Sequence, residues 1–357
     1  KSSMSNNRFF ERINKQIENK RPFILSSDFG KNSISARLQT NSITYKTKDF
    51  SEEGYVFAPF DLSSSVYLIP NEVTEEIGLN EFSTFSSSYN AVYGTISPNQ
   101  HKRLISDAIK AIDGSALEKV VLARTAELDF IKMDIVQLFF SLVSAYPDAY
   151  TYCWYHPKTG FWLGASPETL LKIENHKLKT MALAGTQEYN GSMDVQWDLK
   201  NHEEHSFVTS YLKNKLSDYI SDIEISSPKT IRAGKLLHLQ TSLSGVLIDN
   251  PNALKALISS IHPTPAVCGT PKKEAMLYIN KFEPIDRAFY SGFLGEINIL
   301  KNNSTVTNLV VNLRCMHIND LKATLFAGGG ITSKSDPEKE WEETEAKLRT
   351  ISSVFTT

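Results

Sequence analysis

The stretch from Ala327 to Thr350 reads AGGGITSKSDPEKEWEETEAKLRT, a run of glycines followed by an acidic segment. Consecutive glycines let a backbone approach a ligand closely and direct successive N–H groups at an anion, so residues 328–330 are predicted to form an anion-binding loop. Ser335 or Asp336 then caps a helix whose first position is a proline. The stretch therefore predicts a ligand-binding loop joined to a helix.

The predicted helix carries charged side chains at the border of its apolar stripe. At 100° per residue, Glu340, Glu343 and Lys347 lie on the same side as Ile351 and Val354. Carboxylates in that position need a partner. A hard cation, Mg²⁺ or Ca²⁺, would take oxygen ligands from them. The alternative is an ordinary amphipathic helix in which Glu343 and Lys347 pair at the edge.

Composition limits the class of protein. The chain has 357 residues, of which 41% are hydrophobic, so it can bury a large core as one domain or two. Its 38 basic and 40 acidic residues form no dense basic block, which argues against nucleic acid as a partner. Cys153, Cys268 and Cys315 lie far apart, without the spacing of a disulfide framework or zinc site. Without a membrane-spanning run or signal peptide, we expect a cytoplasmic monomer that binds no membrane.

Strand-like and helical segments are mixed along the chain without a regular βαβ rhythm. This pattern predicts one large α+β domain with a mainly antiparallel β-sheet core flanked by helices. Residues 1–95 are predicted to be a sheet scaffold of that domain, and residues 96–357 its catalytic region. Ser97 begins a capping box that predicts a helix, and helical periodicity returns over 197–220.

The helix at 197–220 contains a second acidic candidate. Glu204 shares its face with Val208 and Leu212, whereas Glu203 points away, so Glu204 is the inward carboxylate. If Glu204 meets Glu340 or Glu343 across the core, the three form an all-oxygen site suited to Mg²⁺.

A zinc site is the other interpretation of this helix, because the sequence HEEH spans residues 202–205. The spacing of His202 and His205 matches neither the zincin motif nor its inverted form. A less regular zinc site built on the two histidines stays open as a minor alternative.

Three further side chains are candidates because their neighbours are apolar. Lys119 begins a strand, where burial would lower the pKa of its amine and make it a general base; the alternative is an exposed strand-edge lysine. Glu168 precedes the sequence TLL, where burial would raise the pKa of its carboxyl and make it a general acid. Arg314 lies in the apolar segment VVNLRCMHI and needs an anion, either a ligand carboxylate or a protein acid.

A series of motifs in a fixed order resembles the chorismate-utilising enzyme family, which includes isochorismate synthase, salicylate synthase, aminodeoxychorismate synthase and the large chain of anthranilate synthase. The resemblance covers about 119–355. It rests on GASPETLLKI, MALAGT, HEEH, LLHLQTSLSG, HPTPAVCGTP, YSGFLGEI, VNLRC and AGGGI with the helix after it. It implies a large β-sheet core wrapped by helices.

The resemblance also assigns roles to residues. It implies that Lys119 activates water, that Glu168 protonates the departing C4 hydroxyl, and that Mg²⁺ is held by Glu204 and Glu343 with Glu340 nearby. The implied contacts to chorismate are Gly185, Thr186, His238, Tyr290, Arg314, Gly328, Gly329, Gly330 and Lys347. Ala184 stands where aminodeoxychorismate synthases carry a nucleophilic lysine. Asn201 departs from relatives that have an acid there.

The function implied by the resemblance is Mg²⁺-dependent conversion of chorismate to isochorismate. Salicylate synthase, which goes on to eliminate pyruvate with the same residues, is the nearest alternative. Two further alternatives are a chorismate-binding relative without catalytic activity and a metal-dependent hydrolase built on His202 and His205. Isochorismate is used for both menaquinone and siderophore synthesis, and the residues do not choose between them.

Overall fold

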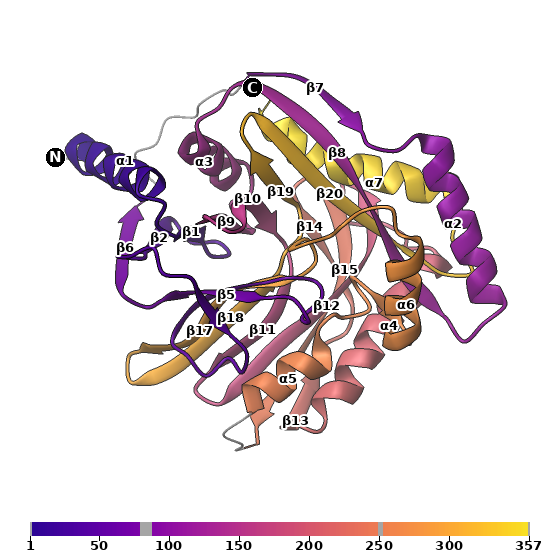
Figure 1. Ribbon diagram of the computed structural model, residues 1–357. Helices are drawn as coiled ribbons and strands as arrows, with labels where there is room; N and C mark the ends of the chain where they lie inside the picture. Colours follow the sequence, from indigo (N-terminus) through magenta and orange to yellow (C-terminus); the bar gives the residue numbers. More distant parts are fainter. Residues whose placement is uncertain (1, 79–87, 249–252, 356–357) are drawn as a thin grey trace.

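The computed structural model describes residues 2–78, 88–248 and 253–355 (Figure 1). Its helices are α1 (Ser2–Glu18), α2 (Pro98–Asp113), α3 (Ile135–Ala145), α4 (Leu199–Leu216), α5 (Ala253–Ile261), α6 (Lys272–Phe282), α7 (Pro337–Ser352) and the short 3₁₀ helix η1 (Ser353–Phe355). Within these ranges, none of the helices combines the length and apolar character needed to cross a bilayer.

The strands form two sheets of ten, and every pair of neighbours is antiparallel. The first sheet runs in the order β16 (Gly269–Thr270), β8 (Lys119–Lys132), β20 (Lys322–Ile331), β19 (Cys315–Asn319), β10 (Gly160–Ser166), β9 (Tyr150–His156), β1 (Phe23–Ser27), β2 (Ser33–Leu38) and β6 (Val73–Gly78), with β7 (Ser88–Gly94) also paired to β8.

The second sheet runs in the order β13 (Ile220–Ile225), β15 (Leu236–Leu247), β12 (Lys177–Glu188), β11 (Thr169–Glu174), β18 (Ser304–Val311), β17 (Phe293–Lys301), β4 (Gly54–Ala58), β5 (Val66–Pro70) and β3 (Tyr45–Thr47), with β14 (Lys229–Ala233) also paired to β15. The predicted α+β class is therefore confirmed, but the core contains two sheets. Strands from the range 1–95 extend both of them.

An aromatic core joins the two sheets. Phe57 on β4 of the second sheet is fully buried and stacks on Trp154 of β9 in the first sheet, with ring centroids 4.7 Å apart. On its other side Phe57 stacks on Phe289 at 4.5 Å. Buried aromatic rings remove large apolar areas from water, and stacked pairs add a directional attraction. This core sets the spacing of the sheets.

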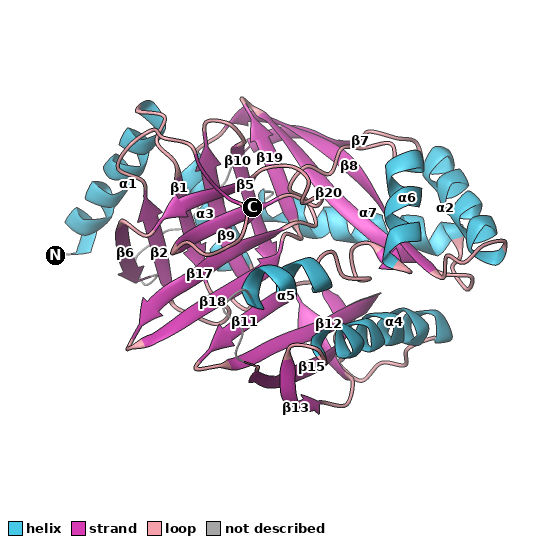
Figure 2. Cartoon of the chain, turned by 60° about the horizontal axis from the view of Figure 1, so that its bottom comes forward, coloured by secondary structure: helices cyan, strands magenta, loops and turns pink. Residues whose placement is uncertain are grey.

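Helices cover the outer faces of the sheets (Figures 1 and 2). Helix α7 packs on β20 and α3 packs on β9 and β10, all in the first sheet. Helix α4 lies along β12 of the second sheet, with α5 beside it (Figure 2). Consequently, α4 and α7 flank the region where β8 and β20 of one sheet meet β12 and β15 of the other.

Several local predictions are confirmed by the structure. Ser97 caps α2 with both hydrogen bonds of a capping box. Of the two proposed caps for α7, Asp336 accepts from the amides of Glu338 and Lys339. The helix predicted over 197–220 is shorter and ends at Leu216, where β13 follows after three residues. Arg314 is not inside a strand, because it falls between β18 and β19 with φ +49°.

Replacing Phe57 with alanine should lower the free energy of unfolding by about 3–5 kcal/mol, because it leaves a cavity between Trp154 and Phe289. Phe57→Leu should lose only about 1.5 kcal/mol, since it keeps most of the volume. Urea unfolding followed by tryptophan fluorescence measures both. Leu277→Ala, at a side chain that is 61% exposed, is the control and should stay within about 0.5 kcal/mol of the parent. Equal losses for Phe57→Ala and Leu277→Ala would contradict this account of the core.

Candidate active site

A cavity of about 50 Å³ brings together most of the predicted site residues. Its walls come from β8 and β20 of the first sheet, β12 and β15 of the second, and helices α4 and α7. Ten of the predicted residues line it: Glu168, Gly185, Thr186, Glu204, His238, Tyr290, Arg314, Gly328, Gly330 and Lys347. The other four do not line it but adjoin residues that do: Lys119 contacts Glu204, Glu343 contacts Lys347, Gly329 lies between Gly328 and Gly330, and Glu340 lies near Gly329.

The glycines at 328–330 do not form the predicted loop. They lie in β20 and pair with β8, with Gly328 opposite Ala123 and Gly330 opposite Val121. On the other edge, pairing with β19 reaches only Leu325, so this part of the strand lacks a partner there. The carbonyl of Gly328 accepts a hydrogen bond of 2.7 Å from Lys347 Nζ. The prediction of a loop was wrong because these glycines allow other elements to pack closely against an extended strand and do not form a turn.

The packing around these glycines leaves no room for a side chain. A Cβ on Gly330 would lie 2.0 Å from Glu204 Oε1 and 2.8 Å from Lys119 Cε. On Gly328 it would lie 2.8 Å from the Tyr290 hydroxyl. Distances under about 3 Å are repulsive for carbon, so the bare strand lets α4, β8 and β20 approach one another here.

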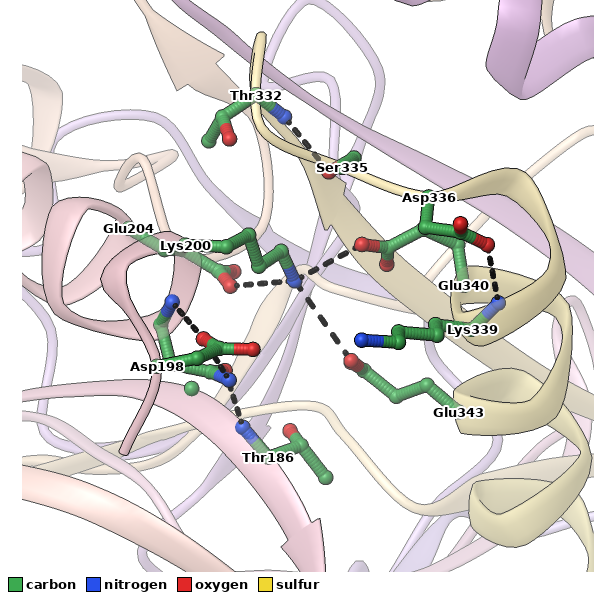
Figure 3. A network of polar contacts seen from close by, with 12 residues as sticks. Thr186, Asp198, Lys200, Glu204, Thr332, Ser335, Asp336, Lys339, Glu340 and Glu343 are labelled. Carbon is green, nitrogen blue, oxygen red and sulfur yellow. Dashed lines mark hydrogen bonds and ion pairs between the residues drawn. The ribbon is translucent and has the colours of Figure 1, made fainter. Parts of the chain in front are cut away.

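Three carboxylates from two helices converge on one ammonium group, that of Lys200 (Figure 3). Lys200 Nζ lies 3.1 Å from Glu204 Oε2, 3.1 Å from Glu340 Oε1 and 3.7 Å from Glu343 Oε2. All four side chains are largely buried. Glu204 and Glu343 are 139 positions apart in the chain. They nevertheless contact the same cation, as a metal site shared by the two residues would require.

Two further lysines neutralise the outer side of this acid group. Lys119 Nζ lies 3.2 Å from Glu204 Oε1 as an ion pair without hydrogen-bond alignment, and Lys347 Nζ lies 2.6 Å from Glu343 Oε1. Burial alone would raise the pKa of the Glu204 carboxyl, but the ammonium groups of Lys119 and Lys200 outweigh burial and lower it to about 2. Glu204 is therefore a carboxylate at neutral pH.

The acid group fits a hard divalent cation by its chemistry. Its ligands are oxygens, and Glu340 Oε2 is buried without a hydrogen-bond partner in the described part of the chain. Burial, followed by the charges of Glu343 and Glu204, raises the pKa of Glu340 to about 7 despite Lys200. Across the described residues, no group of three His, Cys, Asp or Glu side chains is drawn in tightly enough to hold an ion directly. Lys200 fills the position between them.

Burial shifts the pKa values of Lys119 and Glu168 in the directions expected of a base and an acid. Lys119 is completely buried, which excludes the strand-edge alternative. Burial lowers the pKa of its amine, while Glu204 and Glu168 partly offset that effect. Glu168 is 3% exposed, and burial raises the pKa of its carboxyl to about 8 although Lys119 and Arg314 oppose the shift. At neutral pH the Glu168 carboxyl therefore carries a proton.

Arg314 and His238 form a neutral-histidine pair at one end of the cavity. His238 Nδ1 donates to the Gly185 carbonyl at 2.9 Å, so its Nε2 is free to accept from Arg314 Nη2 at 3.3 Å. Burial, then the Arg314 charge, lowers the pKa of His238 to about 3. No carboxylate of the described residues pairs with Arg314. Its charge is available for an anionic ligand, which disfavours the alternative of a buried protein ion pair.

Sequence reasoning missed Lys200, and it named Asn201 only as a departure from relatives that have an acid at that position. The Asn201 side-chain carbonyl accepts from the amide of Thr186 at 3.1 Å, and it lies against Gly185, whose φ of +85° favours glycine. Asn201 therefore positions the irregular part of β12 at Gly185 and Thr186, to which the resemblance assigns ring contact. The available signal for Lys200 was its spacing of four residues from Glu204 on one helix face.

The histidines of the HEEH sequence do not come together. His202 is exposed, whereas His205 is buried with Nε2 2.8 Å from Thr241 Oγ1. The geometry gives no support to a zinc site shared by these two residues.

The fold and site define an enzyme of the chorismate-binding class. A family profile described as chorismate binding enzyme matches residues 71–356, which is most of the chain. The chain belongs to this family.

Within the family, the relatives to which the chain is similar include isochorismate synthases. EntC of Escherichia coli strain K12 is 31% identical over 284 residues, 76% of this chain and 71% of EntC. The vibriobactin-specific isochorismate synthase of Vibrio cholerae is 29% identical over 308 residues, 82% of this chain and 76% of that protein. The crystal structure described as the 2,3-dihydroxybenzoate-specific isochorismate synthase DhbC of Bacillus anthracis has a TM-score of 0.82 at 23% identity, covering 97% of this chain and 99% of that one. The structural likeness supports the fold.

Gly330→Ala should disrupt the site while leaving the sheets intact, because the added Cβ clashes with Glu204 and Lys119. We expect turnover of chorismate to fall at least about 100-fold, as misplacement by about 1 Å does in active sites. Gly78→Ala is the matched control, since this exposed glycine at the end of β6 has no atom within 4 Å of the added Cβ. Steady-state kinetics and circular dichroism measure the two effects. Parental turnover in Gly330→Ala would show that the close packing is irrelevant to the site.

Proposed function

We propose that this protein is an isochorismate synthase that converts chorismate to isochorismate with the help of Mg²⁺. The observation that carries the proposal is a buried amine and a protonated carboxyl at one site: Glu168 lines the cavity, and Lys119 contacts Glu204 on the cavity wall. The names of the relatives support the same reaction. The reaction adds water at C2 of the ring, shifts the two conjugated ring double bonds and releases the C4 hydroxyl. It therefore needs one base and one acid.

Lys119 is the base in this proposal. Its Nζ takes a proton from water and the water oxygen bonds to C2. The two conjugated ring double bonds then each move one position, from C1–C2 to C1–C6 and from C5–C6 to C4–C5, as the C4–O bond breaks. The amine lies deep in the protein beside β16, where bulk water does not solvate it. Burial lowers the pKa of this amine and so makes the neutral form, which accepts the proton, easier to reach than for an exposed lysine.

Glu168 is the acid. As the C4–O bond breaks, the carboxyl delivers its proton to the departing oxygen, which leaves as water. Because the pKa of Glu168 is raised to about 8, this proton is present at neutral pH. Its backbone is fixed on both sides, since its amide donates to Ser166 Oγ at 3.2 Å and its carbonyl accepts from the Val311 amide at 3.0 Å.

The two carboxylates of chorismate require cationic or polar partners. Arg314 offers a guanidinium at one end of the cavity, with the Tyr290 hydroxyl beside the strand at Gly328. A planar guanidinium suits a carboxylate because it donates two parallel hydrogen bonds. Lys347 lies at the opposite helix and holds both Glu343 and the Gly328 carbonyl in place.

Mg²⁺ would be held by Glu204 and Glu343, with Glu340 as a further or water-mediated contact. When bound, the ion would fix the ring carboxylate and stabilise the charge that develops during bond breaking. The residues that present these oxygens are fixed by helix geometry, since Glu340 and Glu343 lie one turn apart on α7.

Removing either member of the acid and base pair should abolish synthesis of isochorismate. We expect Lys119→Met and Glu168→Gln each to lower kcat about 100- to 10,000-fold, the range for general acid or base catalysis. Product analysis by chromatography after incubation with chorismate and Mg²⁺ measures the loss. Lys158→Met, at an exposed turn lysine, should keep parental activity.

The same assay separates isochorismate synthase from its alternatives. Isochorismate as the product in the parent protein supports the proposal, whereas strong salicylate fluorescence without an added lyase would assign the chain to salicylate synthase. Retained turnover in Lys119→Met would remove the proposed base. No turnover in the folded parent protein would leave a chorismate-binding protein without this activity.

The alkaline limb of the pH profile should report Glu168. Its folded-state pKa is raised to about 8, so the catalytic proton is present below this pH and lost above it. We expect kcat/KM for chorismate to fall with a slope approaching tenfold per pH unit above about pH 8. Circular dichroism over the same range controls for unfolding. A profile that stays flat to about pH 9.5 would contradict the role given to Glu168.

A further inference from the structure

Lys200 has an unusual position for a lysine on the first turn of a helix. It is 8% exposed, and its amine lies where Glu204, Glu340 and Glu343 meet (Figure 3). Burial disfavours the charge, but these three carboxylates outweigh burial and raise the pKa of Lys200 well above its ordinary value. The group is therefore an ammonium ion surrounded by acids.

Among the described residues, Lys200 is the only cationic side chain that contacts all three of these carboxylates. The remaining oxygens of Glu204 and Glu343 are taken by Lys119 and Lys347. The second oxygen of Glu340 is buried without a partner in the described structure. The inward oxygens therefore depend on Lys200, and like charges buried this closely repel strongly without a cation between them.

A divalent cation and the Lys200 ammonium cannot both occupy this position. A cation bound by the oxygens that now contact Lys200 would lie next to Lys200 Nζ, and the two positive charges would repel each other. The acids would hold the divalent ion more strongly because each attraction scales with charge. A free monovalent cation has no such advantage over an ammonium tethered at high effective concentration.

The structure provides space into which Lys200 can move. Lys200, Glu340 and Glu343 lie on the wall of an open pocket of about 330 Å³, which shares Thr186 with the cavity. Asp198 and Glu188 also line this pocket and offer carboxylates to a displaced ammonium. The same opening gives a metal ion a route to the acids that avoids the cavity proposed for chorismate.

We propose that Lys200 is an internal counter-cation: in the metal-free protein it occupies the divalent-cation position between Glu204, Glu340 and Glu343, and a divalent ion displaces it into the adjoining open pocket. Lys200 thereby keeps the three acids assembled without metal and sets a selectivity for divalent over monovalent cations. The inference rests on the metal site of the proposed function, but its test measures binding without chorismate.

The test is calorimetric titration of the substrate-free protein with MgCl₂. Lys200→Met, which retains the apolar stem without the charge, should bind Mg²⁺ about 10- to 100-fold more tightly than the parent, because the ion no longer displaces an ammonium. Lys334→Met is the matched control. Lys334 borders the same pocket but pairs with Glu203 at 2.7 Å, so its variant should bind within about threefold of the parent.

Thermal stability supplies a second readout. Without metal, Lys200→Met should melt below the parent because its acids repel, and Mg²⁺ should raise its melting temperature by more than it raises that of the parent. Affinity unchanged or weakened in Lys200→Met would overturn the inference. So would a smaller Mg²⁺-induced stabilisation.

If Lys200→Met does not fold, the parent protein decides the question. A crystal soaked with MnCl₂ should show an anomalous peak among the three glutamates, with Lys200 Nζ moved into the pocket. A bound ion with Lys200 still in contact with all three acids would overturn the inference. Absence of isochorismate in the separate product assay, with tighter binding by Lys200→Met, would reject the proposed function while the counter-cation role stands.

Discussion

The buried ionic cluster between α4, α7 and β8 is the interaction on which the site depends. Glu204, Glu340 and Glu343 face the amino groups of Lys119, Lys200 and Lys347, so three acids meet three amines. A buried charge without a partner is strongly unfavourable, and removing one member leaves its neighbours uncompensated. The cluster therefore requires α4, α7 and β8 to be in place together, and it links these two helices to that strand.

Glycine in β20 makes this cluster possible. Gly330 faces Glu204 of α4 and Gly329 faces Glu340 and Glu343 of α7, and a side chain at Gly330 would occupy the position of the Glu204 carboxylate. Gly329 likewise faces Glu340 Oε2 at 3.3 Å from its ideal Cβ. The strand supplies hydrogen bonds to β8 on one edge while taking almost no volume from the charged groups that pack against its faces. Sheet continuity and an ionic interior are thus combined in one segment.

Periodicity and capping predicted the local structure well because those signals are themselves local. The Ser97 capping box and the inward direction of Glu204 follow from helix geometry alone. The three glycines were misread because a sequence does not show which distant groups press on a strand. Lys200 was overlooked for a related reason. An i, i+4 lysine and glutamate on a helix is usually a solvated pair, and only the approach of α7 turns it into a buried contact. The family resemblance supplied the site residues that periodicity could not bring together.

The position of α7 in the chain has a consequence for how the site is assembled. All twenty strands in the described residues precede Pro337, whereas Glu340, Glu343 and Lys347 come after it. Two of the three acids of the cluster therefore follow the last strand of either sheet in the chain. The cluster is completed only when α7 docks on β20, so a chain in which this helix fails to dock would keep the strands of both sheets but lose Glu340, Glu343 and Lys347 from the site.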